Sequence, residues 1–233
     1  DFFLALLLAL IQGLTEFLPV SSSAHLLFPS LLFGVKDFGI VFDISVHAGT
    51  LAAVIYFFKK EIQSLLYAWT PWKKTRSKED FSLGLNLLVA TLPIVVVGLL
   101  ASDLTESRSA NINSIAWANL VFAGLLYAAF KSSSQSKSLT ELTLSAALII
   151  GCFQALAVFP GASRSGMAIT GALIIGLNIK DTSKFAFLLS IPTILGALVL
   201  MLAKGAYSIA LSDMLIMLTG FFGSAFIAFV TIK

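Results

Sequence analysis

Charged side chains are scarce in this sequence of 233 residues, because Asp, Glu, Lys and Arg together make up only 12% of it. A typical soluble domain carries about 25%. The net charge of +3 is small and concentrated in a few loops, so it indicates orientation in a membrane and not a nucleic-acid partner. The single cysteine, Cys152, excludes an internal disulfide. The shortage of charge excludes an ordinary soluble domain.

Hydrophobic residues, in contrast, make up 58% of the chain, and the mean hydropathy is +0.97. Crossing about 30 Å of hydrocarbon takes roughly 20 apolar residues in a helix. A β-barrel would need short alternating segments instead. The sequence therefore predicts an all-α integral membrane protein, with residues 1–233 forming a single membrane domain. Five continuous apolar stretches are the predicted full transmembrane helices: 39–58, 82–101, 114–130, 183–204 and 210–231.

Two other apolar stretches, 2–34 and 142–179, are interrupted by proline, serine and a charged or titratable residue. The interruptions fall at residues 19–25 and 160–165. A break in a helix exposes backbone polar groups that hydrocarbon cannot satisfy, so it must be buried in protein or line a wet cavity. We therefore interpret each stretch as a re-entrant helical hairpin.

The orientation of the chain follows from the loop at 59–80, which carries six Lys or Arg residues against three acids. Positively charged loops stay in the cytoplasm. Counting spans from there puts the loop at 103–108 outside and the linker at 131–137 inside. The first hairpin then enters from outside and the second from inside, so that their broken midpoints face each other near the membrane centre.

The two halves of the chain also resemble each other. Residues 12–23 (QGLTEFLPVSSS) align with residues 154–165 (QALAVFPGASRS) with one residue of slippage, although chance similarity between apolar segments is the alternative. Because three full spans follow the first hairpin, the second copy is inverted across the membrane. We predict one repeat at about 1–130 and another at about 141–233, with the last C-terminal helix of the second repeat absent from this sequence.

Gln12 and Glu16 are four residues apart, so on a helix they project from one face and can grip one ligand together. An acid inside an apolar run is costly in lipid and by default indicates function. A structural hydrogen bond between the hairpins is the alternative. Asp43 and His47 form a second pair at this spacing inside a span, and both cavity lining and packing remain open for them.

Three serines, Ser21, Ser22 and Ser23, stand where the second arm of this hairpin begins, after the expected break at Pro19. Serine there suits N-capping, which for any one of them explains its presence as well as catalysis does. His25 lies three residues beyond Ser22, roughly one helical turn, where its ring can reach a hydroxyl or a phosphate. A buried structural contact is the alternative for this histidine.

In the second hairpin Arg164 is the decisive residue. A guanidinium at membrane depth needs an anionic partner, and its planar fork fits phosphate oxygens. Gly161 allows close backbone approach, while Ser163 and Ser165 offer hydroxyls and backbone N–H groups at the start of the second arm. Opposed hairpins would bring two helix N-termini and Arg164 to one anion site, where a divalent cation would bridge Glu16 to phosphates. Structural neutralisation of Arg164 by Glu16 is the alternative.

Residues 12–25 (QGLTEFLPVSSSAH) and 160–166 (PGASRSG) resemble the motifs of the bacterial undecaprenyl-pyrophosphate phosphatase family, also called bacitracin-resistance proteins. The resemblance extends over nearly the whole chain. It implies a membrane hydrolase that converts undecaprenyl pyrophosphate to undecaprenyl phosphate and inorganic phosphate, recycling the carrier lipid for peptidoglycan synthesis. It also implies a divalent metal, Mg²⁺ or Ca²⁺, and a multi-pass protein of the bacterial inner membrane whose site opens to the outer, periplasmic side.

Carried onto this sequence, the family's acidic, serine–histidine and arginine motifs supply the candidate catalytic residues Glu16, Ser22, His25 and Arg164. The remaining polar or small residues of the two breaks are the candidate substrate contacts: Gln12, Ser21, Ser23, Gly161, Ser163 and Ser165. Glu16 is the implied metal ligand, with Gln12 as a second candidate. The sequence departs from the family pattern at Gln12, where many members have glutamate, and at Ala168, where threonine is usual.

The leading hypothesis is metal-assisted phosphoryl transfer, in which Arg164 and the two helix N-termini hold the pyrophosphate and Glu16 binds the metal. His25 activates the nucleophile or protonates the leaving group, and either Ser22 or a water molecule attacks. The principal rival is an inverted-repeat transporter or flippase for a phosphorylated lipid or another anion. A purely structural scaffold leaves both buried charges without a reason. The oligomeric state stays open, with a homodimer as one alternative.

Overall fold

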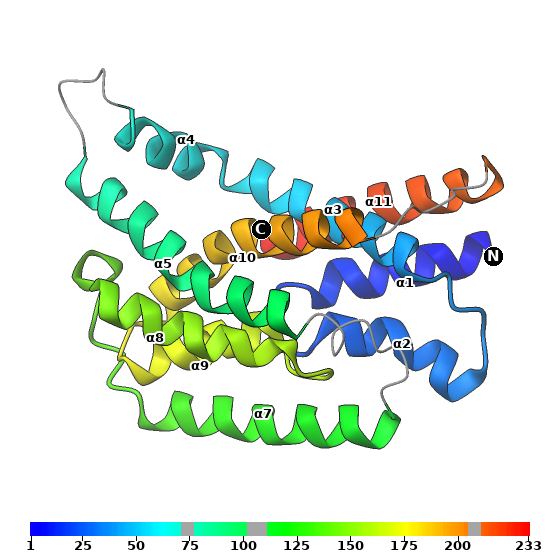
Figure 1. Ribbon diagram of the computed structural model, residues 1–233, viewed down its shortest axis with the longest axis horizontal. Coiled ribbons are helices and arrows are strands. Elements are labelled where there is room, and N and C mark those ends of the chain that lie inside the picture. The colour runs from blue at the N-terminus through cyan, green and yellow to red at the C-terminus, as the bar shows by residue number, and fades with distance from the viewer. Residues whose placement is uncertain (71–76, 102–110, 205–210) are drawn as a thin grey trace.

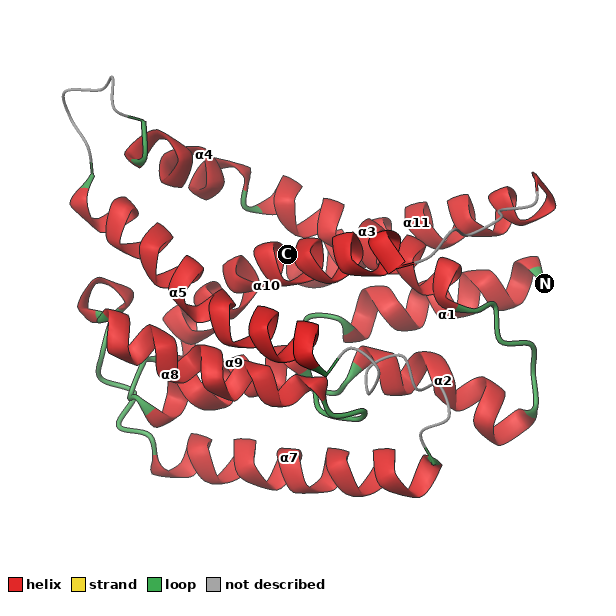
Figure 2. Cartoon of the chain, in the orientation of Figure 1, coloured by secondary structure: helices red, strands yellow, loops and turns green. Residues whose placement is uncertain are grey.

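The computed structural model describes residues 1–70, 77–101, 111–204 and 211–233. Within these ranges the regular secondary structure is helical (Figure 1), apart from one isolated β-bridge between Lys137 and Leu177. Figure 2 accordingly shows only helices joined by loops in the described parts of the chain. Of the loops used above for orientation, residues 71–76 and 103–108 lie outside the described ranges.

Long apolar helices dominate the described ranges, and they confirm the predicted membrane fold class. Five of these helices are long and apolar enough to cross a bilayer: α3 (Ile40–Phe57), α5 (Lys78–Leu100), α7 (Ile112–Ser132), α10 (Ile179–Lys204) and α11 (Leu211–Ile232). Each of the five matches one predicted span. Large apolar side chains cover their outer faces, such as Leu100, which is 84% exposed, and Phe226, which is 67% exposed. Such faces are stable against lipid and unfavourable in water.

Two pairs of shorter helices form the predicted interrupted segments: α1 (Phe2–Thr15) with α2 (Ser22–Phe33), and α8 (Leu144–Ala155) with α9 (Arg164–Ile174). At 1.5 Å per residue, the 14 residues of α1 extend about 21 Å, less than a hydrocarbon core of about 30 Å. In each pair the second helix runs back beside the first, and the two elbows point toward each other (Figure 1). Their re-entrant position in a bilayer stays a prediction.

Both breaks begin earlier than predicted, several residues before the prolines at their centres. A proline cannot donate a hydrogen bond to the carbonyl four residues back, and its ring clashes with that carbonyl. For Pro19 that carbonyl belongs to Thr15, which is the last residue of α1. For Pro160 it belongs to Leu156, and α8 ends one residue before, at Ala155. The expected break at Pro19 is therefore corrected: the elbow of the first hairpin starts at Glu16.

The hairpins are held by long helices from the opposite half of the chain. α1 packs against α11, and α8 packs against α5. Small residues permit the close approach: a Cβ at Gly13 would lie 2.6 Å from Ile227 Cβ, and one at Gly151 would lie 2.5 Å from the Ala90 carbonyl oxygen. This reciprocal packing agrees with the predicted inverted repeat. The repeat and its absent last helix stay predictions.

The main apolar core lies where α10 contacts α3, α5 and α9. Its largest fully buried side chain is Phe185, and Leu189 lies one turn further along the same helix, also fully buried. α10 also reaches the first elbow, where Phe187 packs on Phe17 with ring centroids 5.5 Å apart.

Candidate active site

The first elbow carries Gln12 and Glu16 at the end of α1. Gln12 lies in the last turn, and Glu16 is the C-cap residue, still in the right-handed helical conformation. Both side chains therefore project from one face, as predicted, and Gln12 Nε2 donates to Glu16 Oε2 at 2.8 Å. Gln12 is 0% exposed and Glu16 is 5% exposed. A carboxylate thus lies buried inside an apolar helical bundle.

Ser22, the first residue of α2, directs its hydroxyl at the same carboxylate. Its Oγ donates to Glu16 Oε2 at 2.6 Å. Ser21 occupies the N-cap position with a φ of 62°, and its side chain makes no capping hydrogen bond, so the capping explanation is wrong for Ser21. Ser23 is exposed. Of these three serines, Ser22 is the one that contacts the buried carboxylate.

The second elbow ends where α9 begins. Ser163 is the N-cap of α9, and its Oγ accepts a hydrogen bond from the Gly166 N–H at 3.1 Å. Ser165 Oγ donates to the Leu18 carbonyl oxygen of the first elbow at 2.8 Å. The two elbows therefore touch, and Arg164 is presented between these two serines at the point of contact.

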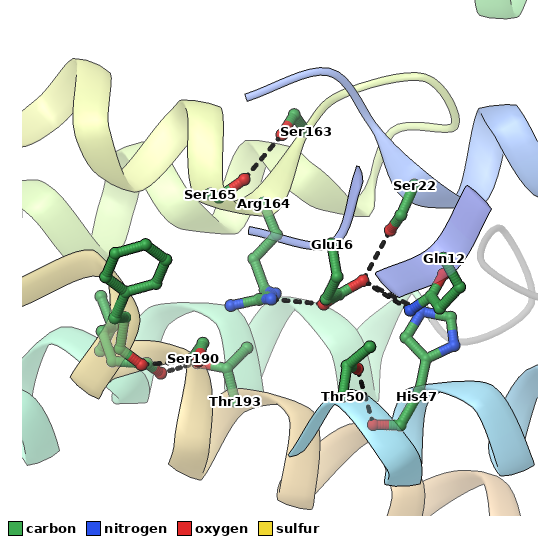
Figure 3. A network of polar contacts seen from close by, with 12 residues as sticks. Gln12, Glu16, Ser22, His47, Thr50, Ser163, Arg164, Ser165, Ser190 and Thr193 are labelled. Carbon is green, nitrogen blue, oxygen red and sulfur yellow. Dashed lines mark hydrogen bonds and ion pairs between the residues drawn. The ribbon is translucent and has the colours of Figure 1, made fainter. Parts of the chain in front are cut away.

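Arg164 and Glu16 form an ion pair across the two elbows, with Nη2 2.5 Å from Oε1 (Figure 3). The side chains are only 16% and 4% exposed. Taking two charges out of water is costly, and their attraction offsets this cost only when further hydrogen bonds satisfy them. Glu16 meets this condition, because its other oxygen, Oε2, accepts from Gln12 and Ser22. The predicted meeting of a carboxylate from one hairpin with a cation from the other matches this geometry.

His47 of α3 joins the cluster from a third direction. Its Nε2 lies 3.6 Å from Glu16 Oε2 (Figure 3). Its Nδ1 lies 2.7 Å from the Asp43 carbonyl oxygen. For the i, i+4 pair of Asp43 and His47, cavity lining and a packing or hydrogen-bonding role were both open, and the contacts of His47 agree with the hydrogen-bonding role. The carboxylate of Glu16 is thus approached by side chains of α1, α2, α3 and α9.

Two predicted site residues make their contacts elsewhere. His25 Nδ1 lies 2.9 Å from the Ser21 carbonyl oxygen, and its ring packs on Phe28 with centroids 5.4 Å apart. Within the described part of the chain, no hydrogen bond or ion pair joins His25 to the Glu16 cluster. Gly161, with a φ of 96°, approaches α7, where a Cβ would lie 2.6 Å from the Ile115 carbonyl oxygen. The roles assigned to these two residues stay predictions.

A cavity of about 170 Å³ adjoins Arg164 between the first elbow and the helices α9 and α10. Apolar side chains form most of its wall, and the hydroxyls of Ser165, Ser183 and Ser190 line it as well. Ser190 is 1% exposed and lies close to the cluster (Figure 3). Sequence reasoning missed both α10 serines, because a serine hydroxyl on a helix gives no signal until the fold shows which face it occupies. An anionic group the size of a phosphate fits such a cavity beside a guanidinium.

Two side chains of the site, Gln12 and Glu16, offer oxygen atoms of the kind that a divalent cation takes as ligands. Gln12 Oε1 is buried and accepts no hydrogen bond from any described residue, although its amide contacts Glu16. Amide and carboxylate oxygens are the hard ligands that Mg²⁺ and Ca²⁺ take. Among the described residues, no three His, Cys, Asp or Glu side chains gather around one point. The predicted metal site stays a prediction.

The fold and the site together define a class: a polytopic helical membrane protein with a buried carboxylate and guanidinium, contributed by two opposed elbows, beside a hydroxyl-lined cavity. The family model described as bacitracin resistance protein BacA matches residues 5–233, so the chain belongs to this family. The family resemblance drawn from the two elbow motifs is thereby confirmed.

Proteins from several bacteria are similar to this chain. The undecaprenyl-diphosphatase of Saccharophagus degradans is 47% identical over 194 residues, which cover 83% of this chain and 73% of that protein. That of Alcanivorax borkumensis is 46% identical over 198 residues, covering 84% and 75%. That of Teredinibacter turnerae is 44% identical over 195 residues, covering 83% and 74%.

Proposed function

We propose that this chain is a membrane phosphatase that hydrolyses undecaprenyl pyrophosphate to undecaprenyl phosphate and inorganic phosphate. The observation that carries the proposal is the pairing of Glu16 with Arg164 between the elbows, beside a cavity that takes a phosphate group. Three relatives bear the name undecaprenyl-diphosphatase, which favours hydrolysis over the transporter alternative. The substrate's two phosphates supply the anion, and its lipid tail stays in the hydrocarbon around the helices.

Arg164 binds the pyrophosphate in this scheme. Its bond to Glu16 uses one guanidinium nitrogen, Nη2, and among the described residues its other N–H groups have no partner. The planar fork therefore remains available for two phosphate oxygens. α2 and α9 begin at Ser22 and Arg164, and their N-termini add backbone N–H groups and partial positive charge at the same point.

Ser22 is positioned as the nucleophile, because its hydroxyl already donates to the Glu16 carboxylate. In the first step a bond forms between Ser22 Oγ and the terminal phosphorus, and the bridging P–O bond breaks as undecaprenyl phosphate leaves. The Ser22 proton passes to Glu16. In the second step water attacks the phosphoserine, and the Ser22–phosphorus bond breaks as one water proton passes to the Ser22 oxygen and restores its hydroxyl. Inorganic phosphate leaves with the other water proton and the proton that Glu16 held.

Three further residues complete the proposed machinery. Gln12 and Glu16 would hold a Mg²⁺ or Ca²⁺ ion through their side-chain oxygens. When bound, the ion offsets the negative charge of the phosphates. His25, one turn beyond Ser22 on α2, is the candidate proton donor to the bridging oxygen.

We infer further that the protein lies in the bacterial inner membrane with its site opening to the outer side. The basic loop at 59–80 supports a cytoplasmic position for the start of α5. α2 then leads from the elbow toward the outer surface, which gives lipid pyrophosphate a route to Ser22. In this position the enzyme returns the carrier lipid to peptidoglycan synthesis.

The test is phosphate release by the purified protein in detergent, with undecaprenyl pyrophosphate as substrate and with Mg²⁺ or Ca²⁺ added. Ser22→Ala is expected to lose at least about 100-fold in kcat, whereas Ser30→Ala, a change further along α2 at a serine whose hydroxyl donates to its own helix, should keep wild-type activity. Brief reaction with terminally ³²P-labelled substrate, followed by acid quenching, should leave label on Ser22. Full turnover by Ser22→Ala would overturn the nucleophile. Lipid movement across liposomes without phosphate release would overturn the phosphatase.

A further inference from the structure

A second cleft, of about 210 Å³, lies outside the candidate active site where α4 (Lys59–Ala68), the start of α5 and the start of α10 meet. Two leucines form its apolar side, and the rest of its lining is polar or charged: Lys60, Glu61, Ser64, Asp80 and Lys184. We call it the α4–α5 cleft. None of its residues takes part in the proposed catalysis, and α4 with the start of α5 lies well away from the elbows (Figure 1).

The four charged side chains of the α4–α5 cleft are two cations and two anions. Among the described residues, none of the four forms an ion pair or a side-chain hydrogen bond. Glu61, Asp80 and Lys184 are only partly exposed. A cleft lined by cations and anions that do not pair with one another is complementary to a zwitterionic ligand, which carries one charge of each sign.

Neighbouring aromatic side chains place the α4–α5 cleft at the level of lipid headgroups. Trp69, at the end of α4, stacks on Phe81 of α5 with ring centroids 5.1 Å apart, and Trp69 is 43% exposed. Half-exposed tryptophan beside lysine-rich helix ends is typical of the boundary between hydrocarbon and water. Lys59 reinforces this boundary, because its Nζ lies 4.3 Å from the Tyr56 ring centroid. A lipid headgroup is therefore the ligand expected in the cleft, because headgroups are concentrated at this boundary.

We propose that the α4–α5 cleft binds the headgroup of an aminophospholipid of the phosphatidylethanolamine type. Lys60 and Lys184 bind the phosphodiester oxygens, and Glu61 and Asp80 accept hydrogen bonds from the primary ammonium group. The leucines contact the glycerol and the first acyl carbons. Phosphatidylglycerol lacks the cation and meets both carboxylates with its negative charge. Phosphatidylcholine has a quaternary ammonium without N–H groups, so it cannot donate to either acid.

Native mass spectrometry of the purified chain with equal amounts of these three lipids tests the proposal. Phosphatidylethanolamine adducts should exceed the other two by at least about fivefold, because only this lipid donates charge-assisted hydrogen bonds from an ammonium group to both acids. Asp80→Asn and Lys184→Gln should each reduce these adducts about tenfold. Glu79→Gln and Lys180→Gln are the matched controls, since they change the same charges on the same helix ends outside the cleft and should bind as wild type does.

Phosphate release from undecaprenyl pyrophosphate serves as the folding control, and all four variants should retain it. Equal binding of the three lipids by the wild-type chain would overturn the proposal. So would the same loss of binding in the Glu79 and Lys180 variants as in the Asp80 and Lys184 variants. Because this readout is lipid retention and not turnover, its failure leaves the proposed phosphatase activity standing.

Discussion

At the scale of single residues, Glu16 is the point on which the site converges. Its buried carboxylate is contacted by Gln12 of its own helix, by Ser22 across the elbow and by Arg164 from a segment 148 positions away. Each partner neutralises the Glu16 charge or donates a hydrogen bond to it, in surroundings that cannot solvate a charge. The loss of one partner therefore leaves part of the desolvation cost of the buried carboxylate without compensation. Two predictions follow from this arrangement.

The first concerns stability. Arg164→Gln is expected to lower the free energy of unfolding by about 3 kcal/mol, because the Glu16 carboxylate stays buried without its cation. Glu16→Gln should cost a similar amount, for the converse reason. The double variant should recover most of the loss, since two amides can hydrogen-bond each other, and it should remain inactive. Unfolding of the purified variants in denaturing detergent measures this, and a double variant as unstable as the sum of the two singles would contradict the pairing.

The second prediction concerns His47, whose Nε2 lies 3.6 Å from Glu16 Oε2. If the ring serves as a donor to that carboxylate, glutamine can replace it, because its amide N–H reaches a similar distance. His47→Gln is expected to keep kcat/KM within about threefold of wild type, and His47→Leu to lose at least about tenfold. Phosphate-release kinetics on both variants decide this. Equal large losses would show that the ring does more than donate a hydrogen bond.

The elbow motifs allowed Glu16, Ser22 and Arg164 to be identified as site residues from the sequence, because a charge or a serine cluster inside an apolar run is unusual by itself. His47 and Ser190 were harder to assign. Each lies in a continuous apolar helix, and its relation to Glu16 or Arg164 depends on how α3 and α10 are rotated about their axes. That rotation is determined by tertiary packing, which the local sequence does not contain.

At the scale of helices, the spans could be predicted closely, because long apolar runs with few charges leave little choice of boundary. The elbows were predicted less well. Proline marks the centre of a break, while the helix ends where the proline removes its hydrogen bond four residues earlier. The prediction therefore placed the first break at Pro19, whereas the structure starts it at Glu16.

Close helix contacts lead to a third prediction. At Gly151 a Cβ would meet the backbone of Ala90, so Gly151→Ala must push α8 away from α5. The expected cost is about 1–3 kcal/mol of unfolding free energy, together with reduced activity, because α8 leads directly to the second elbow. Gly124→Ala is the matched control in α7, where nothing lies within 4 Å of the added Cβ. It should be neutral or slightly stabilising. Thermal unfolding in detergent measures both variants, and equal midpoints would contradict the close-packing argument.

At the scale of the whole molecule, two hairpins from different halves meet at one polar cluster, and each packs against a long helix of the other half. The facing of the elbows could be predicted by counting spans from the basic loop. The reciprocal packing could not, because it depends on which glycines face which helices.

The orientation itself gives a fourth prediction. In a Cys152→Ser background, Val35→Cys should react with a membrane-impermeant maleimide in intact spheroplasts, because the loop between α2 and α3 is expected outside. Glu79→Cys, at the start of α5, should react only after permeabilisation. Both positions are exposed, so access to each depends on sidedness. The reverse labelling pattern would place the site on the opposite side.

The ion pair between the elbows predicts that Glu16 and Arg164 act on the same phosphorylated lipid. The most direct measurement is a double-mutant cycle on kcat/KM for undecaprenyl pyrophosphate, with Glu16→Gln, Arg164→Gln and the double variant. Each single change is expected to lower kcat/KM at least about 100-fold, and the double variant should be no worse than the poorer single variant by more than a few-fold. Losses that multiply in the double variant, or single variants that keep wild-type turnover, would contradict a shared site.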